Sequence, residues 1–191
     1  MQPTFYKVET IGGGFLAIMA RPRANDWAEE EFAGLAEAGI KQILSLLEAH
    51  EEYVLGLEQE AQLSSDASID FVSFPIPDRG VPSNVHALSE LSHQIHLDVT
   101  GGKSTAIHCR AGIGRSSLVA AAVLLHVGIS ADEAFSRIQK ARGLEVPDTP
   151  EQAQWLRENS RAILEAGVPN NALHRCLLAF VTVLAAATTA P

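Results

Sequence analysis

The stretch TAIHCRAGIGRSSLVA (residues 105–120) passes from a short apolar run, through a loop with two glycines, into a run of helix-forming residues. The segment 104–108 (STAIH) predicts a buried strand, and the segment 115–127 (RSSLVAAAVLLHV) predicts a helix. Strand, tight loop and helix in immediate succession are typical of an α/β layered fold. The free N–H groups at the start of a helix, together with the helix dipole, favour an anion, so the junction at 109–114 is a candidate anion site.

The rest of the chain alternates between strand-like and helix-like patterns in the same way. Strand alternation or short apolar runs occur at 4–9, 14–20, 41–47 and 69–76, and helical periodicity occurs at 25–40, 50–63, 83–99, 130–143 and 149–167. Asp26 and Ser130 are the expected N-caps of the helices 25–40 and 130–143. We therefore predict one α/β domain over residues 1–168, with a central, largely parallel sheet flanked by helices on both faces.

Composition narrows the setting of this domain. The chain has 191 residues with a formal net charge of −9, which argues against a general binder of nucleic acid. Two cysteines are too few for a disulfide framework in a domain of this size, and the first residues lack the pattern of a secretory signal. We expect a cytoplasmic protein with a free thiol.

The loop 109–114 combines the groups that a phosphate-directed nucleophile needs. Gly112 and Gly114 allow successive amides to fold inward around an anion, and Arg115 offers a planar fork of donors to two oxygens. An electropositive cradle of this kind favours the thiolate form of cysteine, which is the nucleophilic form. The alternative is a buried structural cysteine at Cys109, on an ordinary strand-to-helix turn.

The segment HCRAGIGRS (108–116) resembles the His-Cys-(five residues)-Arg-Ser/Thr signature of the cysteine-dependent protein tyrosine and dual-specificity phosphatases. The chain is similar in length to the compact dual-specificity group. The resemblance implies the fold of that group, no cofactor and no metal. It also implies that Cys109 is the nucleophile, that Arg115 binds phosphate and the transition state, that Ser116 helps the thiolate to leave, and that His108 shapes the loop. The implied phosphate-binding residues are Arg110, Ala111, Gly112, Ile113, Gly114 and Arg115.

A general acid is also needed, because an alkoxide or phenoxide leaves readily only when it is protonated as it departs. Members of the family carry an aspartate on a mobile loop that follows a strand, roughly thirty residues before the cysteine. In FPIPDRGVP (74–82), Asp78 stands at that distance in a loop marked by three prolines and a glycine. We predict Asp78 as the acid; its alternative role is that of an ordinary turn residue, and Asp66 and Asp98 are weaker candidates for the acid.

Gln152 is the candidate for orienting the water that hydrolyses a phosphocysteine, because VPDTPEQAQWL (146–156) resembles the segment that carries this glutamine in the family. Gln154 is the second choice. The pattern Thr149-Pro150-Glu151-Gln152 is also a capping box with proline at the first helical position, which would explain Gln152 without catalysis. The two roles are compatible.

The expected partner is a phosphorylated protein, with phosphotyrosine the favoured group and dual specificity open. Apolar Ile113 stands where phosphoinositide-directed relatives carry a second basic residue, but a phosphatase for a non-protein ester such as a phosphoinositide stays an alternative, as does a phosphoprotein-binding module without turnover. His86, His93 and His96 fall near one helix face, yet they lack the supporting ligand pattern of a zinc site. Within the tail 169–191, the apolar run 176–187 has twelve residues, which is too short for an ordinary bilayer span. We therefore expect the tail to form a helix packed on the domain or on a second subunit in a homodimer, with a weak membrane anchor as the alternative.

Overall fold

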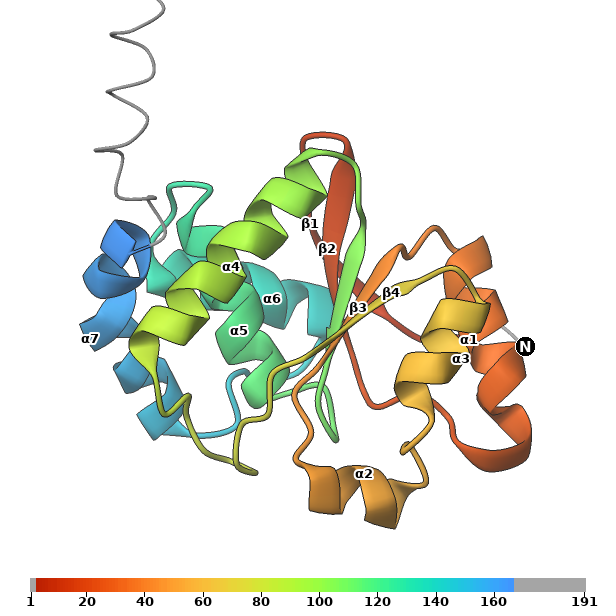
Figure 1. Ribbon diagram of the computed structural model, residues 1–191. Coiled ribbons are helices and arrows are strands. Elements are labelled where there is room, and N and C mark those ends of the chain that lie inside the picture. The colour runs from red at the N-terminus through yellow and green to blue at the C-terminus, as the bar shows by residue number, and fades with distance from the viewer. Residues whose placement is uncertain (1–2, 167–191) are drawn as a thin grey trace, which may run out of the picture.

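The computed structural model describes residues 3–166, which form a five-stranded sheet with helices on both faces (Figure 1). The strands lie in the order β1-β2-β5-β3-β4, and β2, β5, β3 and β4 are parallel. Only β1 is antiparallel, as one arm of a hairpin with β2. The prediction of a largely parallel sheet is confirmed. The strand bounds are Tyr6–Ile11 (β1), Gly14–Met19 (β2), Gln42–Ser45 (β3), Asp70–Ser73 (β4) and Thr105–His108 (β5).

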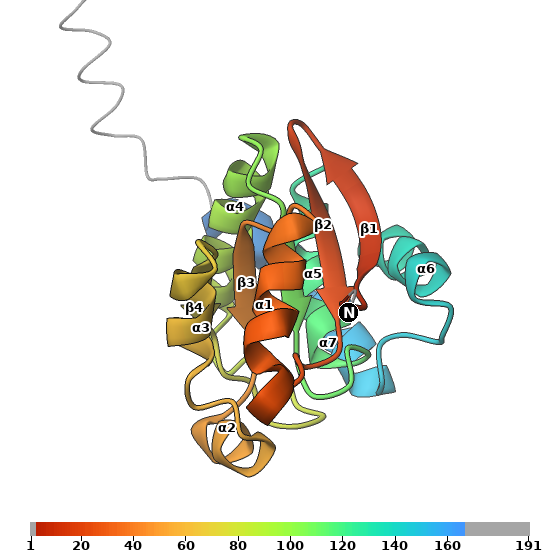
Figure 2. The ribbon, with the colours of Figure 1, turned by 90° about the vertical axis from the view of Figure 1, so that its right-hand side faces the viewer.

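The helices divide into two layers around this sheet. Figure 2 shows α1 in front of the sheet, with α3 beside it and α6 beyond the edge strand β1; α4, α5 and α7 cover the opposite face. The short helix α2 lies beyond one end of the strands (Figure 1). The helix bounds are Ala28–Glu37 (α1), Ala49–Leu55 (α2), Glu60–Asp66 (α3), Val85–Thr100 (α4), Arg115–Leu125 (α5), Ala131–Arg142 (α6) and Pro150–Ala166 (α7).

Side-chain alternation along the strands supplies both faces with apolar groups. Leu16 and Ile18 of β2 belong to the core under α4, α5 and α7, whereas Ala17 and Met19 belong to the core under α1 and α3. Helix α5 lies in the larger core with every one of its residues buried, and its alanines let it pack closely against the sheet. The start of α5 is therefore fixed rigidly at the end of β5.

Two helix predictions differ from the structure. Asp26 is not the N-cap of α1, because a 3₁₀ turn (η1, Asn25–Trp27) begins at Asn25 in a left-handed conformation and α1 then starts without a side-chain cap. The single helix predicted over 50–63 is two helices, because Gly56 takes a left-handed φ of 68° and ends α2. Ser130 does cap α6, since its hydroxyl accepts the N–H of Glu133.

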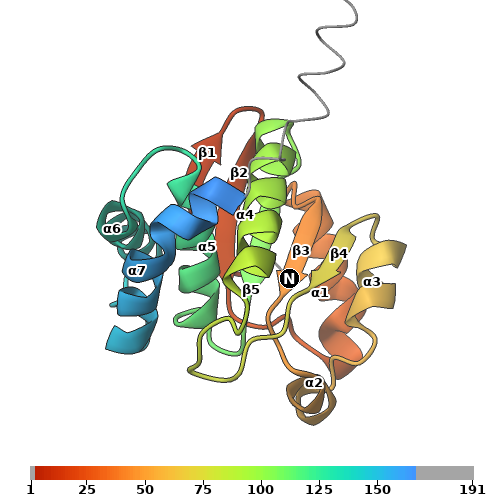
Figure 3. The same ribbon diagram turned by 60° about the vertical axis from the view of Figure 1, so that its left-hand side comes forward.

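The carboxyl ends of the parallel strands all lie at the same end of the sheet. The loops that follow β3, β4 and β5 meet there with α2 and with the start of α7, as Figure 3 shows from another side. Ligand sites of α/β folds lie at this carboxyl end of the strands. The tail 169–191, with its predicted helix and dimer contact, lies outside the described residues; within 3–166, no helix is long and apolar enough to cross a bilayer.

Candidate active site

The loop 109–114 joins β5 to α5 and places Cys109 at the start of a buried anion cradle. Cys109 is 3% exposed, and its Sγ lies 3.6 Å from Oγ of Ser116 in the first turn of α5. The N-cap Gly114 offers no side chain to the first helical N–H groups, which leaves them free for an anion. Gly112 has a φ of 68°, and a Cβ there would lie 2.5 Å from the carbonyl group of Met19, so only glycine fits this bend.

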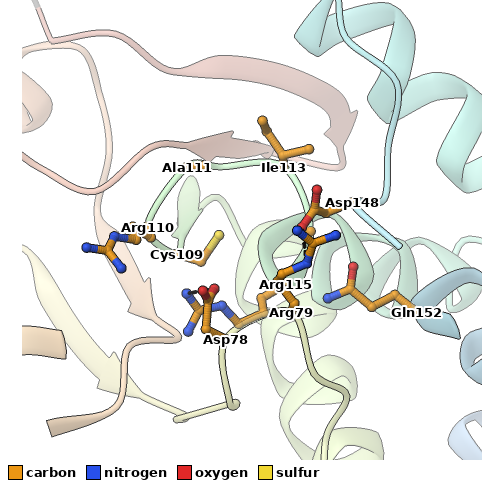
Figure 4. Close-up of a pocket in the computed structure, with 10 residues that line it drawn as sticks. Asp78, Arg79, Cys109, Arg110, Ala111, Ile113, Arg115, Asp148 and Gln152 are labelled. Atoms are coloured by element: carbon orange, nitrogen blue, oxygen red, sulfur yellow. Dashed lines mark hydrogen bonds and ion pairs between the residues drawn. The ribbon is translucent and has the colours of Figure 1, made fainter. Parts of the chain in front are cut away.

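A cavity of about 210 Å³ opens over this loop (Figure 4). The predicted acid, the predicted nucleophile and the predicted water-orienting residue all line it, although they come from three separate segments. Its walls are Asp78, Arg79, Cys109, Arg110, Ala111, Ile113, Gly114, Arg115, Asp148 and Gln152.

Arg115 is buried beside this cavity and is held by acceptors from four positions. Its side chain is 2% exposed, and Glu51 binds it through both carboxylate oxygens, at 2.6 Å from Nη1 and 2.9 Å from Nη2. Nη1 also donates to the carbonyls of Leu46 (3.3 Å) and Ile76 (2.9 Å), and Nη2 donates to Oδ1 of Asp78 (2.9 Å). Within this guanidinium, Nη1 and Nη2 both have acceptors, whereas no described residue supplies an acceptor for the Nε–H.

Arg115 and Glu51 each stabilise the ionised form of the other side chain. Burial alone would lower the pKa of Arg115, but the hydrogen bond to Glu51 and the negative charges of Cys109, Glu51 and Asp78 raise it above its usual value. Burial would raise the pKa of Glu51, yet the hydrogen bonds from Arg115 and from the Glu48 N–H, with the guanidinium charge, keep it below its usual value. Both groups therefore stay ionised at neutral pH.

The loop that carries Asp78 is attached to its surroundings at three consecutive residues. Asp78, whose side chain is 53% exposed, contacts Arg115. Arg79 lies 3.3 Å from Asp148, and the carbonyl of Gly80 accepts a hydrogen bond of 2.9 Å from Nε2 of Gln152. In this structure the loop is closed against the start of α7.

His108 and Gln152 lie behind and beside the cradle. Nε2 of His108 lies 2.8 Å from Oε1 of Glu60, with both side chains buried, in an orientation that falls short of a hydrogen bond. His108 is therefore placed behind the loop and away from the cavity, as a loop-shaping residue would be. Gln152 is fully buried and is one of the residues that line the cavity, and its Oε1 has no hydrogen-bond partner among the described residues.

Three residues of this site are not predicted by any local pattern in the sequence. Glu51 and Asp148 come from α2 and from the loop before α7, and Arg142 at the end of α6 donates to the carbonyls of Ala111 and Gly112. None belongs to a local motif, because each acts on a residue far away along the chain. The one available signal was general: a buried arginine requires a carboxylate partner.

Other candidates lie elsewhere. Asp98 binds the side chain of Gln42 at the opposite end of the strands, so it cannot protonate a leaving group in this cavity. His93 and His96 face the ring of His126 between α4 and α5. Within residues 3–166, no cluster of three or more histidine, cysteine or acidic side chains could hold a metal ion.

A cysteine beneath a glycine loop, an arginine clamped by carboxylates and an aspartate on a facing loop define the class of protein tyrosine and dual-specificity phosphatases. Residues 17–129 match the family model Tc-R-P, described as "Polymorphic toxin system, DSP-PTPase phosphatase". The chain belongs to this phosphatase family.

Several known proteins share part of the sequence or the fold. Cyclin-dependent kinase inhibitor 3 of Sus scrofa is 34% identical over 86 residues, which cover 44% of this chain and 40% of that protein, so the chain matches about two fifths of the length of that relative. Phosphatidylglycerophosphate phosphatase PTPMT1 of Arabidopsis thaliana is 27% identical over 109 residues, covering 56% of this chain and 31% of that protein.

Solved structures agree with the fold over most of the chain. Kinase associated phosphatase, with its catalytic-site cysteine replaced by serine, has a TM-score of 0.75 at 23% identity and covers 85% of this chain and 97% of its own. Tk-PTP in its active form has a TM-score of 0.69 at 28% identity, covering 84% and 99%. The dual-specificity phosphatase fold predicted from the signature is confirmed.

Proposed function

We propose that this chain hydrolyses phosphate monoesters through a phosphocysteine intermediate on Cys109. The observation that carries the proposal is the position of the Cys109 thiol, at the base of a cavity between the N-terminus of α5, the Arg115 guanidinium and the Asp78 carboxyl group. A non-catalytic phosphate-binding module would use the cradle and Arg115, but it would have no use for a thiol, a hydroxyl and an acid around the same point.

In the first step, the Cys109 thiolate attacks phosphorus as the ester oxygen departs. The S–P bond forms and the P–O bond to the leaving group breaks. Asp78, which has left Arg115 and carries a proton at this stage, donates that proton to the departing oxygen. The three non-bridging phosphate oxygens lie against the amides of residues 110–115 and against Arg115. Nε of Arg115 is a free donor for one oxygen, and Nη2 becomes a second donor when Asp78 moves from it to the leaving group.

In the second step, water attacks the phosphocysteine, the S–P bond breaks and inorganic phosphate leaves. Asp78, now a carboxylate, takes the proton from the water, and the free Oε1 of Gln152 accepts the other water hydrogen. The hydroxyl of Ser116, 3.6 Å from Sγ, donates to the thiolate as it departs. The mechanism needs a free thiol, which a reducing compartment such as the cytoplasm would suit.

The substrate that we propose is a phosphorylated protein, with phosphotyrosine the preferred residue. Ile113 and Ala111 give one wall of the cavity an apolar surface that an aromatic ring could contact, and within the signature loop only Arg110 follows Cys109 as a basic residue before Arg115. The similarity to cyclin-dependent kinase inhibitor 3 supports a protein substrate. The similarity to phosphatidylglycerophosphate phosphatase PTPMT1 makes a lipid phosphate the alternative.

The test is a panel of phosphotyrosine, phosphoserine and phosphothreonine peptides and phosphoinositide vesicles, assayed for phosphate release without metal. Cys109→Ser should lose turnover at least about a thousandfold, because a serine hydroxyl ionises far less readily than a thiol, and it should still bind phosphopeptide. Normal turnover in Cys109→Ser would refute the mechanism. Faster release from the vesicles than from every peptide would replace the protein substrate by a lipid, and release from all three peptides would establish dual specificity.

A further inference from the structure

Three consecutive carbonyl groups of the phosphate loop point outward, away from the cavity. The carbonyl of Arg110 accepts the backbone N–H of Arg21 at 3.3 Å. The carbonyl of Ala111 accepts Nη2 of Arg142 at 3.3 Å, and that of Gly112 accepts Nε of the same side chain at 3.2 Å. One arginine therefore binds two of the three carbonyls.

The direction of these carbonyls fixes the direction of the amides that follow them. In a trans peptide, the C=O of one residue and the N–H of the next point to opposite sides. The peptides of this loop are trans, since the only cis bond in the described part of the chain joins Val146 to Pro147. The N–H groups of Ala111, Gly112 and Ile113 therefore point toward the cavity, as an oxyanion requires.

Arg142 is placed for this contact by two other elements. It is the last residue of α6, which ends there because Gly143 takes a left-handed φ of 74°. Its guanidinium lies 4.2 Å from the ring centroid of Tyr6 in β1, within the range of a cation–π contact. Figure 2 shows α6 beyond β1 at this edge of the sheet.

We infer that Arg142 is a positioning residue of the phosphate site, and that Tyr6 supports it. Arg142 lies outside the cavity wall and acts by holding two loop carbonyls outward, which turns the next two amides toward phosphate. Two hydrogen bonds from Nε and Nη2 need the planar fork of arginine, and the single ammonium of lysine cannot reproduce that geometry. This inference rests on the proposed function, because it assumes that the loop binds a phosphoryl group.

The competing explanation is that Arg142 only joins α6 to β1. Arg137 provides the control, because it makes such a connection and does not touch the loop. Its Nη1 lies 2.5 Å from Glu9 of β1, and its Nε lies 2.9 Å from Glu133 on its own helix. Loss of Arg137 removes a link between the same two elements and leaves the loop contacts intact.

The experiment compares Arg142→Met, Arg142→Lys, Tyr6→Leu and Arg137→Met with the unsubstituted chain. The probes are inorganic phosphate and orthovanadate, measured as inhibitors and by their protection of Cys109 from alkylation, with thermal unfolding followed in parallel. Arg142→Met should bind both anions roughly tenfold more weakly. It should also lose kcat as well as kcat/KM, because the amides donate more strongly to the phosphoryl oxygens of the transition state than to those of the bound substrate. Arg142→Lys and Tyr6→Leu should fall between, and Arg137→Met should bind within about twofold of the unsubstituted chain.

Each outcome decides between the explanations. Unchanged anion affinity in Arg142→Met, or an equal loss in Arg137→Met, would overturn the positioning role while the proposed function stands. If the unsubstituted chain neither binds these anions nor hydrolyses phosphate esters, the proposed function fails, and this inference fails with it. If Arg142→Met does not fold, Arg142→Lys and Tyr6→Leu decide: full affinity in both would overturn the inference.

Discussion

Arg115 lies on the first turn of α5. Its guanidinium donates hydrogen bonds to acceptors at the end of β3, on α2 and in the loop after β4. A buried guanidinium requires such pairing, since an isolated buried charge is very costly. Glu51 supplies a bidentate carboxylate within the same buried environment. The pair holds the Arg115 guanidinium in one orientation before any substrate arrives, which would lower the entropy cost of binding the phosphate that we propose as its ligand.

Glu51→Gln should destabilise the fold by about 3 kcal/mol, because it leaves the buried charge of Arg115 without its principal counterion. It should also weaken phosphate binding, since the guanidinium loses its fixed orientation. Urea unfolding and inhibition by phosphate measure the two effects.

The matched control is Glu52→Gln on the same helix. Burial and the nearby charge of Glu60 raise the pKa of Glu52, with His108 opposing them. Its negative charge therefore opposes folding at neutral pH, and its removal should not destabilise the protein. Equal losses in the two variants would show that the helix, rather than the Glu51–Arg115 pair, is what the substitution disturbs.

Asp78→Asn tests the acid, and the expected result depends on the leaving group. Turnover of a tyrosyl or alkyl phosphate should fall roughly a hundredfold or more, whereas a substrate with a very acidic leaving group should suffer much less. The high-pH limb of the wild-type rate profile should disappear in the variant. The same loss on good and poor leaving groups, with that limb intact, would reduce Asp78 to a ligand of Arg115.

At the scale of elements, the first turn of α7 combines a cap with a contact to the acid loop. The hydroxyl of Thr149 accepts the N–H of Gln152 at 3.2 Å, which is one half of the predicted capping box. The other half is missing, because the Gln152 amide reaches across to the carbonyl of Gly80 instead. The side chain thus joins α7 to the loop that carries Asp78.

Gln152→Ala should slow phosphocysteine hydrolysis more than its formation, because the water loses an acceptor while Cys109 keeps its place. A burst of product equal to the enzyme concentration should then precede a slower steady state, visible in rapid-quench assays. Gln154→Ala is the control, since that side chain is exposed and bonds only Glu158. Loss of the burst together with slower formation would assign Gln152 to the loop contact alone.

The sequence sufficed for the strands, for most of the helices and for the local part of the site. Alternation and helical period located all five strands, and the signature placed Cys109, Arg115 and Ser116 because strand, loop and helix are contiguous there. Local patterns could not reveal that Gly56 divides a helical stretch, or that Asn25 begins a 3₁₀ turn, because neighbouring segments decide these conformations. Glu51, Asp148 and Arg142 escaped for the same reason, since the fold alone brings them to the loop.

At the scale of the whole molecule, a cluster of three half-buried histidines lies between α4 and α5, where the rings of His93 and His96 contact that of His126. Burial, together with the charges of His93 and His96, lowers the pKa of His126 to about 4, and its Nε2 lies 3.0 Å from Oγ of Ser92. Burial and the charge of His93 also lower the pKa of His96. These groups stay neutral in the folded chain at pH values where the unfolded chain protonates them.

Stability should therefore fall as the pH drops from about 6.5 toward 4. In this window the unfolded chain binds a proton that His126 in the folded chain does not. The full shift would lower the free energy of unfolding by roughly 3 kcal/mol, and solvent screening of the half-buried ring reduces this to about 2 kcal/mol. Above about pH 6.5 both states are neutral at this position, and this contribution to stability is fully present. Urea midpoints at pH 7.5, 5.5 and 4.5 measure the trend.

His126→Gln should flatten that pH dependence, whereas His86→Gln should leave it unchanged, because His86 is exposed beside Glu90. A midpoint that falls equally steeply with acid in His126→Gln would place the sensitivity in other groups.

Helix α2 depends on Arg115 for more than its orientation. It has seven residues, ends at Gly56 and leaves Tyr53 and Val54 largely in solvent, so it is too short to persist by itself. The Glu51–Arg115 pair is its firm attachment, and opening α2 must separate that pair. The amide hydrogens of α2 would then exchange with deuterium at a rate set by the release of the guanidinium, so that a surface helix reports the lifetime of the assembled phosphate site.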